Sequence, residues 1–228
     1  MKVFGRNVFN EYKNNYKDIK KIYLSKGFSD KDIINFIKEK HINYDVLDNK
    51  VLDSMVDGNH QGILMEIDDY QYSSLSDIKD ENLIVILDHL EDPHNFGAII
   101  RTCEAAGVKT IIIPKDRSVS VNSTVMKTSV GALNYVKIIR VSNLVNTINN
   151  LKKYGYFIYA ADMDGVNYKD STFASKTVLV IGNEGKGISK LVRDNSDEIV
   201  SIPMNGDINS LNASVACAIL IYGIVNKG

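Results

Sequence analysis

The chain has 228 residues, of which 44% are hydrophobic and 24% are charged, and its formal net charge is -1. This composition is typical of a soluble globular protein that can bury the core of one large domain or two small ones. It excludes a membrane-spanning protein, because the longest apolar stretch is interrupted by Asn212 and Ser214 and is too short to cross a bilayer. The first residues, Met1 to Arg6, predict no signal peptide, because charge follows at once.

The two cysteines, Cys103 and Cys217, lie in apolar helical patterns and are expected to be small buried residues. Neither their number nor their spacing predicts a disulfide framework or a metal site. Together with the missing signal peptide, this cysteine usage predicts a cytoplasmic protein without a bound metal.

The first part of the chain alternates short helical and strand patterns. We expect helices at 6–15, 30–40 and 49–56, and strands at 21–25, 43–47 and 63–67. These elements predict a small α/β domain at 1–70. The stretch 68–80 is rich in serine and acidic residues, which places a linker at 71–80 and a second domain at 81–228.

The charges are unevenly distributed. Residues 1–40 carry ten Lys or Arg against five acids, whereas residues 41–80 carry two against nine. A basic face on the first part of the chain fits a nucleic-acid partner, although the net charge of -1 argues against one. A lysine-rich, solvated helix surface is the simpler explanation of the charge pattern alone.

The second domain begins with a strand–loop–helix–strand unit at 83–114, with its helix expected at 98–106. The loop carries Asn95, Gly97 and Arg101 in the pattern N-x-G-x-x-x-R, at the carboxyl end of a buried strand, where open α/β sheets bind ligands. We expect Asn95 to cap the helix and Gly97 to let a ligand approach the backbone. Arg101 is expected to point from the first helical turns toward the same loop and to hold a phosphate.

A glycine-rich turn follows a second buried strand at 178–181. It runs from Gly182 to Gly187 (GNEGKG), and a helix is expected from about Ile188. Such a turn lets backbone N–H groups approach a ligand. The spacing excludes a dinucleotide fingerprint, and it excludes a P-loop because Gly187 stands where Ser or Thr is required after Lys186. A tight strand-to-helix connection explains the turn equally well.

The last segment combines a short strand at 199–202, a polar loop and a strongly apolar helix at 213–225. Ser210 or Asn209 is expected to cap this helix. The helix is apolar nearly all round, which predicts deep burial. A buried helix whose start is lined with small polar residues suggests a binding site.

Together, the three segments resemble the motifs of the SpoU (TrmH) family of RNA ribose 2′-O-methyltransferases, in the SPOUT superfamily. Asn95, Gly97 and Arg101 match the first motif, and Ile181 to Gly185 with Gly187-Ile188 match the second. The third is matched by Ile202-Pro203-Met204 and then by Ser210, Leu211, Asn212, Ser214 and Ala216. The resemblance covers 81–228. It continues upstream, where Val3 to Val8 and Asn59 to Gly62 look like the substrate-binding domain of the 23S rRNA guanosine methyltransferase branch.

The resemblance implies a fold and a reaction. The fold is α/β, with an L30e-like RNA-binding domain at 1–70 and a SPOUT domain at 81–228 that ties a deep trefoil knot. The reaction transfers a methyl group from S-adenosylmethionine to a ribose 2′-hydroxyl, most closely that of a guanosine in 23S rRNA. The family also implies a homodimer, in which Arg101 acts near the cofactor pocket of the partner subunit.

The resemblance also assigns roles to residues of this chain. It implies that backbone groups of three residues hold the adenosine: Gly182, Ile202 and Leu211. The same motifs surround the cofactor with Ile181, Asn183, Gly185 and Met204. The catalytic set is Arg101, Asn95, Glu184, Ser210 and Asn212, with Glu184 orienting Arg101. The residues expected to contact RNA in the first domain are Arg6, Asn59, His60 and Gln61, although His60 also fits a purely structural hydrogen bond at the entry to a strand.

Three alternatives stay open at this point. The chain could be a non-catalytic RNA-binding or ribosome-assembly factor with the same fold. It could be an α/β enzyme with another nucleotide cofactor, against which the failed fingerprints argue. Within the family, a tRNA is the rival to rRNA as substrate.

Overall fold

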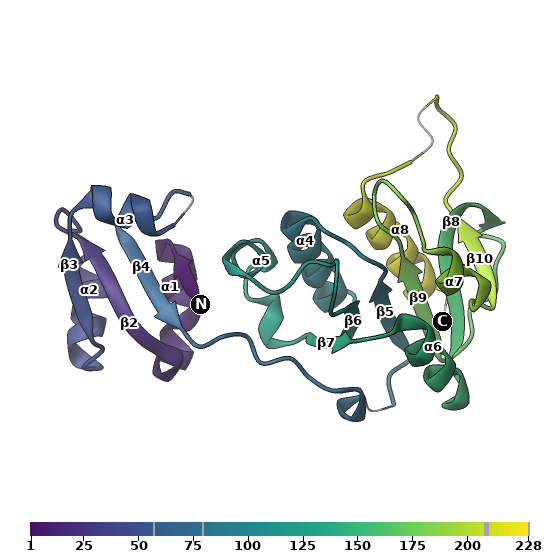
Figure 1. The fold of residues 1–228 in the computed structure, drawn as a ribbon, viewed down its shortest axis with the longest axis horizontal. Helices are drawn as coiled ribbons and strands as arrows, with labels where there is room; N and C mark the ends of the chain where they lie inside the picture. The colour runs from purple at the N-terminus through teal and green to yellow at the C-terminus, as the bar shows by residue number, and fades with distance from the viewer. Residues whose placement is uncertain (57, 79, 208–209, 228) are drawn as a thin grey trace. The chain divides into compact units, whose positions relative to one another are not determined.

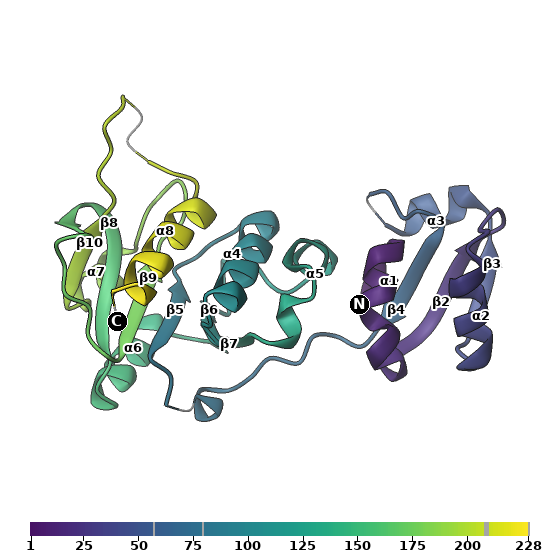
Figure 2. The ribbon, with the colours of Figure 1, turned by 180° about the vertical axis from the view of Figure 1, so that it is seen from behind.

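We describe a computed structural model of the chain, which covers residues 1–228 except 57, 79, 208–209 and 228. The chain divides into two compact units. The first comprises Met1–Gln71 together with Val121–Gly131, and the second comprises Tyr72–Ser120 together with Ala132–Gly228. Figures 1 and 2 show the elements of each unit.

The first unit is a four-stranded sheet with helices. Its elements are β1 (Lys2–Phe4), α1 (Arg6–Tyr12), a 3-10 helix (Lys13–Asp18), β2 (Ile19–Ser25), α2 (Lys31–Glu39), β3 (Tyr44–Leu47), α3 (Asn49–Met55) and β4 (Ile63–Ile67). The strand order is β1-β4-β2-β3, with β2 and β3 parallel and the other pairs antiparallel. The predicted helices and strands are confirmed with small shifts, and β1 is an additional strand. Phe9, Ile22 and Ile37 lie in the buried core of the first unit.

The second unit contains the larger sheet. Its elements are a 3-10 helix (Leu75–Asp77), β5 (Leu83–Leu87), α4 (Pro93–Ala105), β6 (Thr110–Pro114), a 3-10 helix (Ala132–Asn134), β7 (Lys137–Val141), α6 (Leu144–Lys153), β8 (Phe157–Asn167), β9 (Thr177–Ile181), α7 (Lys190–Asp194), β10 (Glu198–Ser201) and α8 (Ala213–Val225). Helix α5 (Ser123–Ser129) belongs to the segment that groups with the first unit.

All pairings in the second sheet are parallel, in the order β10-β8-β9-β5-β6-β7. Every residue of β5, β6 and β9 is buried, because helices cover both faces. Helices α6 and α7 pack with one face, and α4 and α8 lie on the other (Figures 1 and 2). The predicted parallel α/β sheet is confirmed, and the loops after β5, β9 and β10 leave its carboxyl edge.

Helix α4 begins earlier than the sequence analysis expects. Asp92 is its N-cap and accepts a hydrogen bond from the backbone N–H of His94 at 2.8 Å, and Pro93 occupies the first turn. The predicted start at residue 98 is therefore wrong, and Asn95 lies inside the helix rather than at its cap. Arg101 lies roughly 12 Å along the helix from its start, so it does not project from the first turn.

Helix α8 has the predicted bounds, but its cap and its burial differ from expectation. Asn212 is the N-cap, in place of Ser210, and Asn209 lies outside the described residues. One face of the helix is buried, whereas Val215 is 46% exposed and Tyr222 is 43% exposed. The expected burial on all sides is wrong for this single chain, because the neighbouring helix α4 covers only one side.

The turn after β9 is longer than predicted. Helix α7 starts at Lys190, whereas Ile188 is buried in the core of the second unit. In the segment predicted as a linker, Ser73 pairs with Ile139 at the sheet, and Ser74 and Asp77 form a capping box. No helix among the described residues combines the length and the apolar character that a membrane crossing requires.

Candidate functional site

Three polar side chains from the three sequence motifs meet at the carboxyl edge of the second sheet. The side-chain N–H of Asn95 donates to Oε1 of Glu184. Asn212 donates through Nδ2 to Oδ1 of Asn95 at 3.0 Å, and the same nitrogen lies 3.4 Å from Oε1 of Glu184. These residues come from α4, the turn after β9 and the cap of α8, so the fold brings all three motifs to one place.

The chemistry of these groups fixes how both amides are oriented. An ionised carboxylate only accepts hydrogen bonds, so Nδ2 of Asn95 must face Glu184 and leave Oδ1 to accept from Asn212. Oδ1 of Asn212 then accepts from the backbone N–H of Ser214 at 2.9 Å and from its hydroxyl at 2.6 Å. Each of these polar groups thus has a defined role as a hydrogen-bond donor or acceptor. Together they connect the turn after β9 to the starts of two helices, α4 and α8.

The turn after β9 closes on itself. Asn183 and Gly187 exchange two backbone hydrogen bonds, of 3.0 and 2.8 Å. A Cβ on Gly182 would lie 2.3 Å from the carbonyl carbon of Gly187, so the chain can fold back only if residue 182 is glycine. Close packing of the chain against itself therefore explains Gly182 in this structure, in agreement with the tight connection that the sequence left open beside a ligand-binding role. The N–H of Gly185 is bonded to Oδ1 of Asn183 at 2.9 Å.

The apolar residues of the third motif lie on the two segments on either side of residues 208–209, which are outside the described residues. Ile202 follows β10 and is half-buried, whereas Met204 is 38% exposed and Leu211 is 36% exposed. Ser210 is exposed as well. Partly exposed apolar side chains in the third motif and the exposed backbone of Gly185 and Gly187 are the kinds of group that hold a flat, uncharged ring such as adenine, which needs apolar contacts and a few backbone groups. The residues present therefore fit the cofactor that the family resemblance implies.

Arg101 is exposed and stands apart from this cluster. It follows Asn95 by six residues, so its side chain leaves the helix roughly 120° away from that of Asn95. Within the described part of the chain, the carboxylate of Glu184 binds the two asparagines and makes no ion pair with Arg101. Arg101 is thus free to bind a group that comes from outside its own chain.

In the first unit, Arg6, Asn59 and Gln61 gather at one turn. The backbone N–H of Arg6 donates to Oε1 of Gln61 at 2.9 Å, and the N–H of Gln61 donates to Oδ1 of Asn59 at 3.1 Å. The guanidinium of Arg6 lies 3.5 Å from Asp30 and 5.1 Å from the centre of the Phe28 ring. The guanidinium is nevertheless exposed, so it can also face a phosphate.

His60 is only 8% exposed and is engaged inside the fold. Its Nδ1 accepts the N–H of Gly62 at 2.9 Å, so the proton of a neutral ring sits on Nε2, which donates to Asp53 at 3.0 Å. Both ring nitrogens thus hold the turn that enters β4.

Asp88, a carboxylate that directly follows β5, is a residue of this region that the sequence motifs do not include. It is 1% exposed, and its Oδ2 accepts the backbone N–H of Ser189 at 2.7 Å. Oδ1 lies 2.6 Å from Nδ1 of the neighbouring His89. An acidic residue at the carboxyl end of an all-apolar strand was the signal that could have identified it.

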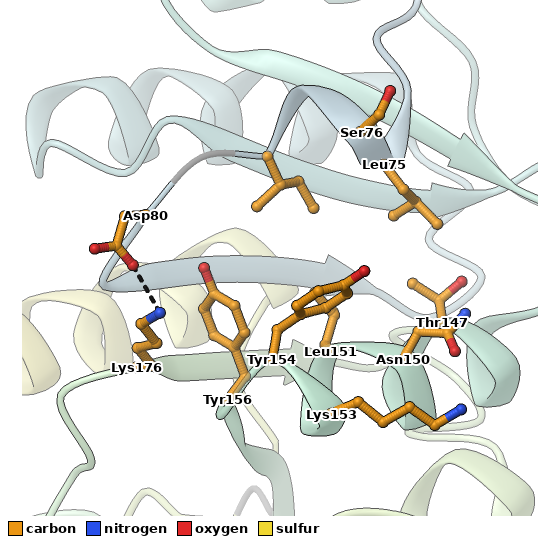
Figure 3. Close-up of a pocket in the computed structure, with 11 residues that line it drawn as sticks. Leu75, Ser76, Asp80, Thr147, Asn150, Leu151, Lys153, Tyr154, Tyr156 and Lys176 are labelled. Carbon is orange, nitrogen blue, oxygen red and sulfur yellow. Dashed lines mark ion pairs between the residues drawn. The ribbon is translucent and has the colours of Figure 1, made fainter.

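A hollow in the second unit lies elsewhere (Figure 3). It has a volume of about 900 Å³ and includes Tyr156 and Lys176, which directly precede β8 and β9 at the amino edge of the sheet. Lys176 pairs with Asp80 at 2.6 Å at one end, and Lys153 lies at the other. None of the motif residues lines this hollow, so we assign the site to the carboxyl edge. No cluster of potential metal ligands occurs among the residues that the structure describes.

Comparisons with known proteins identify the family of the chain. Residues 82–222 match the sequence model of the SpoU rRNA methylase family, and residues 2–73 match that of the RNA 2′-O ribose methyltransferase substrate-binding domain. A protein of Staphylococcus haemolyticus, described as a TrmH family tRNA/rRNA methyltransferase, is 39% identical over 99% of this chain and 95% of its own length.

Two solved structures extend the comparison. An S-adenosylmethionine-bound rRNA methyltransferase from Sinorhizobium meliloti has the same fold, with a TM-score of 0.78 and 24% identity over 99% of this chain and 86% of its own. A TrmH/SpoU tRNA modifying enzyme from A. aeolicus is 33% identical, with a TM-score of 0.59, over 65% of this chain and 76% of its own. The chain therefore belongs to the SpoU (TrmH) family of RNA methyltransferases.

Proposed function

We propose that the protein methylates a ribose 2′-hydroxyl of ribosomal RNA, with a guanosine of 23S rRNA as the target. The observation that carries the proposal is the cluster of Asn95, Glu184 and Asn212, which joins all three motifs at one site. Methylation of the ribose is supported by the substrate-binding family matched at 2–73. The proposed domains are an RNA-binding domain at 1–70, a connection at 71–80 and a methyltransferase domain at 81–228.

The shares of the chain that two solved structures match favour ribosomal RNA over tRNA as the substrate. The rRNA enzyme matches 99% of the chain, whereas the tRNA enzyme matches 65%. An additional domain suits a large, folded RNA, because it adds contacts far from the reacting ribose. The 33% identity to the tRNA enzyme makes tRNA the second candidate.

The proposed cofactor site uses the backbone of Gly182, Ile202 and Leu211, with Ile181, Asn183, Gly185 and Met204 around them. S-adenosylmethionine supplies an electrophilic methyl group when it is bound there. Asn95 and Asn212 hold Glu184 in one orientation, which keeps the turn after β9 in place. Ser210 is exposed and precedes Asn212 by two residues, and we assign it a contact with the RNA phosphate.

Arg101 is proposed to bind the phosphate next to the target ribose and to stabilise the negative charge that develops on the 2′-oxygen. A guanidinium remains protonated at physiological pH, so it acts as a clamp and an electrostatic stabiliser rather than as the base. A phosphate oxygen is a suitable acceptor for the hydroxyl proton. Arg6, Asn59 and Gln61, with His60 supporting their turn, are proposed to hold the RNA at a distance from the reacting ribose.

Because Arg101 does not face the cluster of its own chain, we assign it to the site of a partner subunit. The exposed apolar residues of α8, which include Val215, Tyr222 and Val225, supply a surface for a homodimer. The deep trefoil knot that the family resemblance implies is also part of this proposal. Helix α8 would belong to the knotted segment.

Mixing of subunits tests this dimer. Homodimers of Arg101→Ala and of Glu184→Ala are each expected to be inactive. If Arg101 acts on the partner's site, a 1:1 mixture refolded together regains about a quarter of wild-type activity, since half of the dimers are mixed and each has one complete site. No recovery, with mixed dimers demonstrated by mass spectrometry, would place Arg101 in its own subunit's site.

The substrate is tested by transfer of tritiated methyl groups to unmodified 23S rRNA and to bulk tRNA, with reverse-transcription stops to map the product. We expect labelling of 23S rRNA at a guanosine by the wild type and its loss in Arg101→Ala. Labelling of tRNA alone would make tRNA the substrate. If neither RNA is labelled although the cofactor binds, rRNA and tRNA in isolated form are both excluded as substrates.

A further inference from the structure

The turn after β9 is held at three points by the segment that follows β5. At its start, Nδ2 of Asn183 donates to the carbonyl oxygen of His89 at 2.8 Å. In its middle, Glu184 accepts from Asn95. At its end, the backbone N–H of Ser189 donates to the carboxylate of Asp88 at 2.7 Å. The first two contacts hold only the first half of the turn.

The second half of the turn is anchored by the buried side chain of Ile188 and, through a hydrogen bond, by Asp88. Within the described part of the chain, the hydrogen bonds of Gly185 and Gly187 stay inside the turn and go to Asn183. Among the described residues, the contact of Ser189 with Asp88 is the one hydrogen bond that joins this half to another part of the sheet. Two glycines in so short a stretch leave the backbone free to adopt other conformations unless its end is anchored.

Asp88 is itself firmly placed. Its backbone N–H donates to the carbonyl oxygen of Ile181 at 2.8 Å, which aligns the ends of β5 and β9. The side chain is 1% exposed and is also bonded to His89, whose backbone has φ of 60°, in the left-handed region. A buried carboxylate is costly unless it is well hydrogen-bonded, so its presence here calls for a role that a neutral apolar residue could not fill.

We propose that Asp88 is a positioning residue that sets the conformation of the turn at 182–189 and thereby the affinity for S-adenosylmethionine. This inference rests on the proposed role of that turn in binding the cofactor. Asp88 contacts neither the reacting groups nor the RNA. Its action goes through the N–H of Ser189, one residue before α7.

Four variants separate this role from general stability. Asp88→Ala removes both hydrogen bonds, whereas Asp88→Asn keeps an acceptor for Ser189 and can donate to Nδ1 of His89. Ser189→Pro removes the same N–H from the other side, at an exposed position whose φ of -62° suits proline. Glu81→Ala is the matched control, because Glu81 precedes the same strand β5 at its amino end and its carboxylate accepts from Thr110 at 3.0 Å.

Calorimetric titration with S-adenosylmethionine, at a temperature where circular dichroism shows each variant folded, gives the dissociation constants. We expect Asp88→Ala and Ser189→Pro to bind the cofactor about tenfold more weakly, which corresponds to about 1.4 kcal/mol. Asp88→Asn and Glu81→Ala should stay within about twofold of the wild type. Amide exchange in peptides covering 182–189 should be faster in Asp88→Ala, and affinity for a 23S rRNA fragment should not change.

Several outcomes would overturn the inference. These are wild-type cofactor affinity in both Asp88→Ala and Ser189→Pro, an equal loss in Glu81→Ala, or a loss in Asp88→Asn as large as that in Asp88→Ala. If Asp88→Ala does not fold, Ser189→Pro decides alone. A wild-type protein whose 182–189 peptides gain no exchange protection when the cofactor binds would instead contradict the proposed cofactor site.

Discussion

Substitution of Asn212 should separate two functions of one side chain. Oδ1 caps α8 by accepting from the N–H groups of Ser214 and Val215, at 2.9 and 3.4 Å. Nδ2 donates to Asn95 and lies near Glu184. Serine at 212 can cap the helix but is too short to donate to Asn95, whereas alanine can do neither. Both variants therefore lose the hydrogen bond to Asn95, and only Asn212→Ala also loses the cap of α8.

The expected magnitudes follow from these contacts. The cap is worth about 1 kcal/mol, so Asn212→Ala should unfold about 2–4 °C below Asn212→Ser in a chain of this size. Both variants should lose methyl transfer by about 10²-fold at saturating cofactor, because the turn after β9 loses its link to α8 and reacting groups tolerate little misplacement.

Differential scanning calorimetry and single-turnover methyl transfer measure the two effects. Equal unfolding temperatures for the two variants would refute the capping role of Asn212. Wild-type activity in Asn212→Ser would refute the role of the cluster in placing the turn.

The remaining predictions concern the first unit, the thiols and the dimer. His60→Ala should lower the free energy of unfolding by about 1–3 kcal/mol in urea titrations, because it leaves the N–H of Gly62 without its acceptor, and it should leave cofactor affinity unchanged. Burial raises the pKa of the Cys217 thiol to about 12 and that of Cys103 well above its usual value, so both stay protonated at pH 8. Neither should react with iodoacetamide before unfolding, and labelling of the native protein would contradict their burial. Tyr222→Glu should yield monomers in analytical ultracentrifugation if α8 forms the dimer, and an unchanged mass would place the interface elsewhere.

Local patterns predicted much of the fold. The all-apolar run Leu83 to Leu87 indicated a strand buried on both faces, and such strands occur in parallel sheets. The bounds of α8 followed from the same reasoning. Asp92-Pro93 is a strong helix-start signal that also indicates the observed start of α4, whereas Asn95, a residue type that favours N-caps, lies inside the helix.

Other features depend on contacts between distant residues, which no local pattern encodes. Asp88 and Ser189 are 101 positions apart, and Asn95 and Asn212 are 117 apart. The predicted direction of the Arg101 side chain depends on where α4 begins. Because the predicted start of α4 is wrong, the direction predicted for Arg101 is wrong as well. The half-exposed helix α8 shows that an apolar sequence predicts burial but does not identify the residues that cover the helix.

The most direct test of the account is the chemical position of the transferred methyl group. Unmodified 23S ribosomal RNA is incubated with the protein and with S-adenosylmethionine that carries a deuterated methyl group, and it is then digested to nucleosides for mass spectrometry. The account predicts the label in 2′-O-methylguanosine and its loss in Arg101→Ala. Label on a base, or a 2′-O-methyl product that is formed equally well by Arg101→Ala, would contradict it.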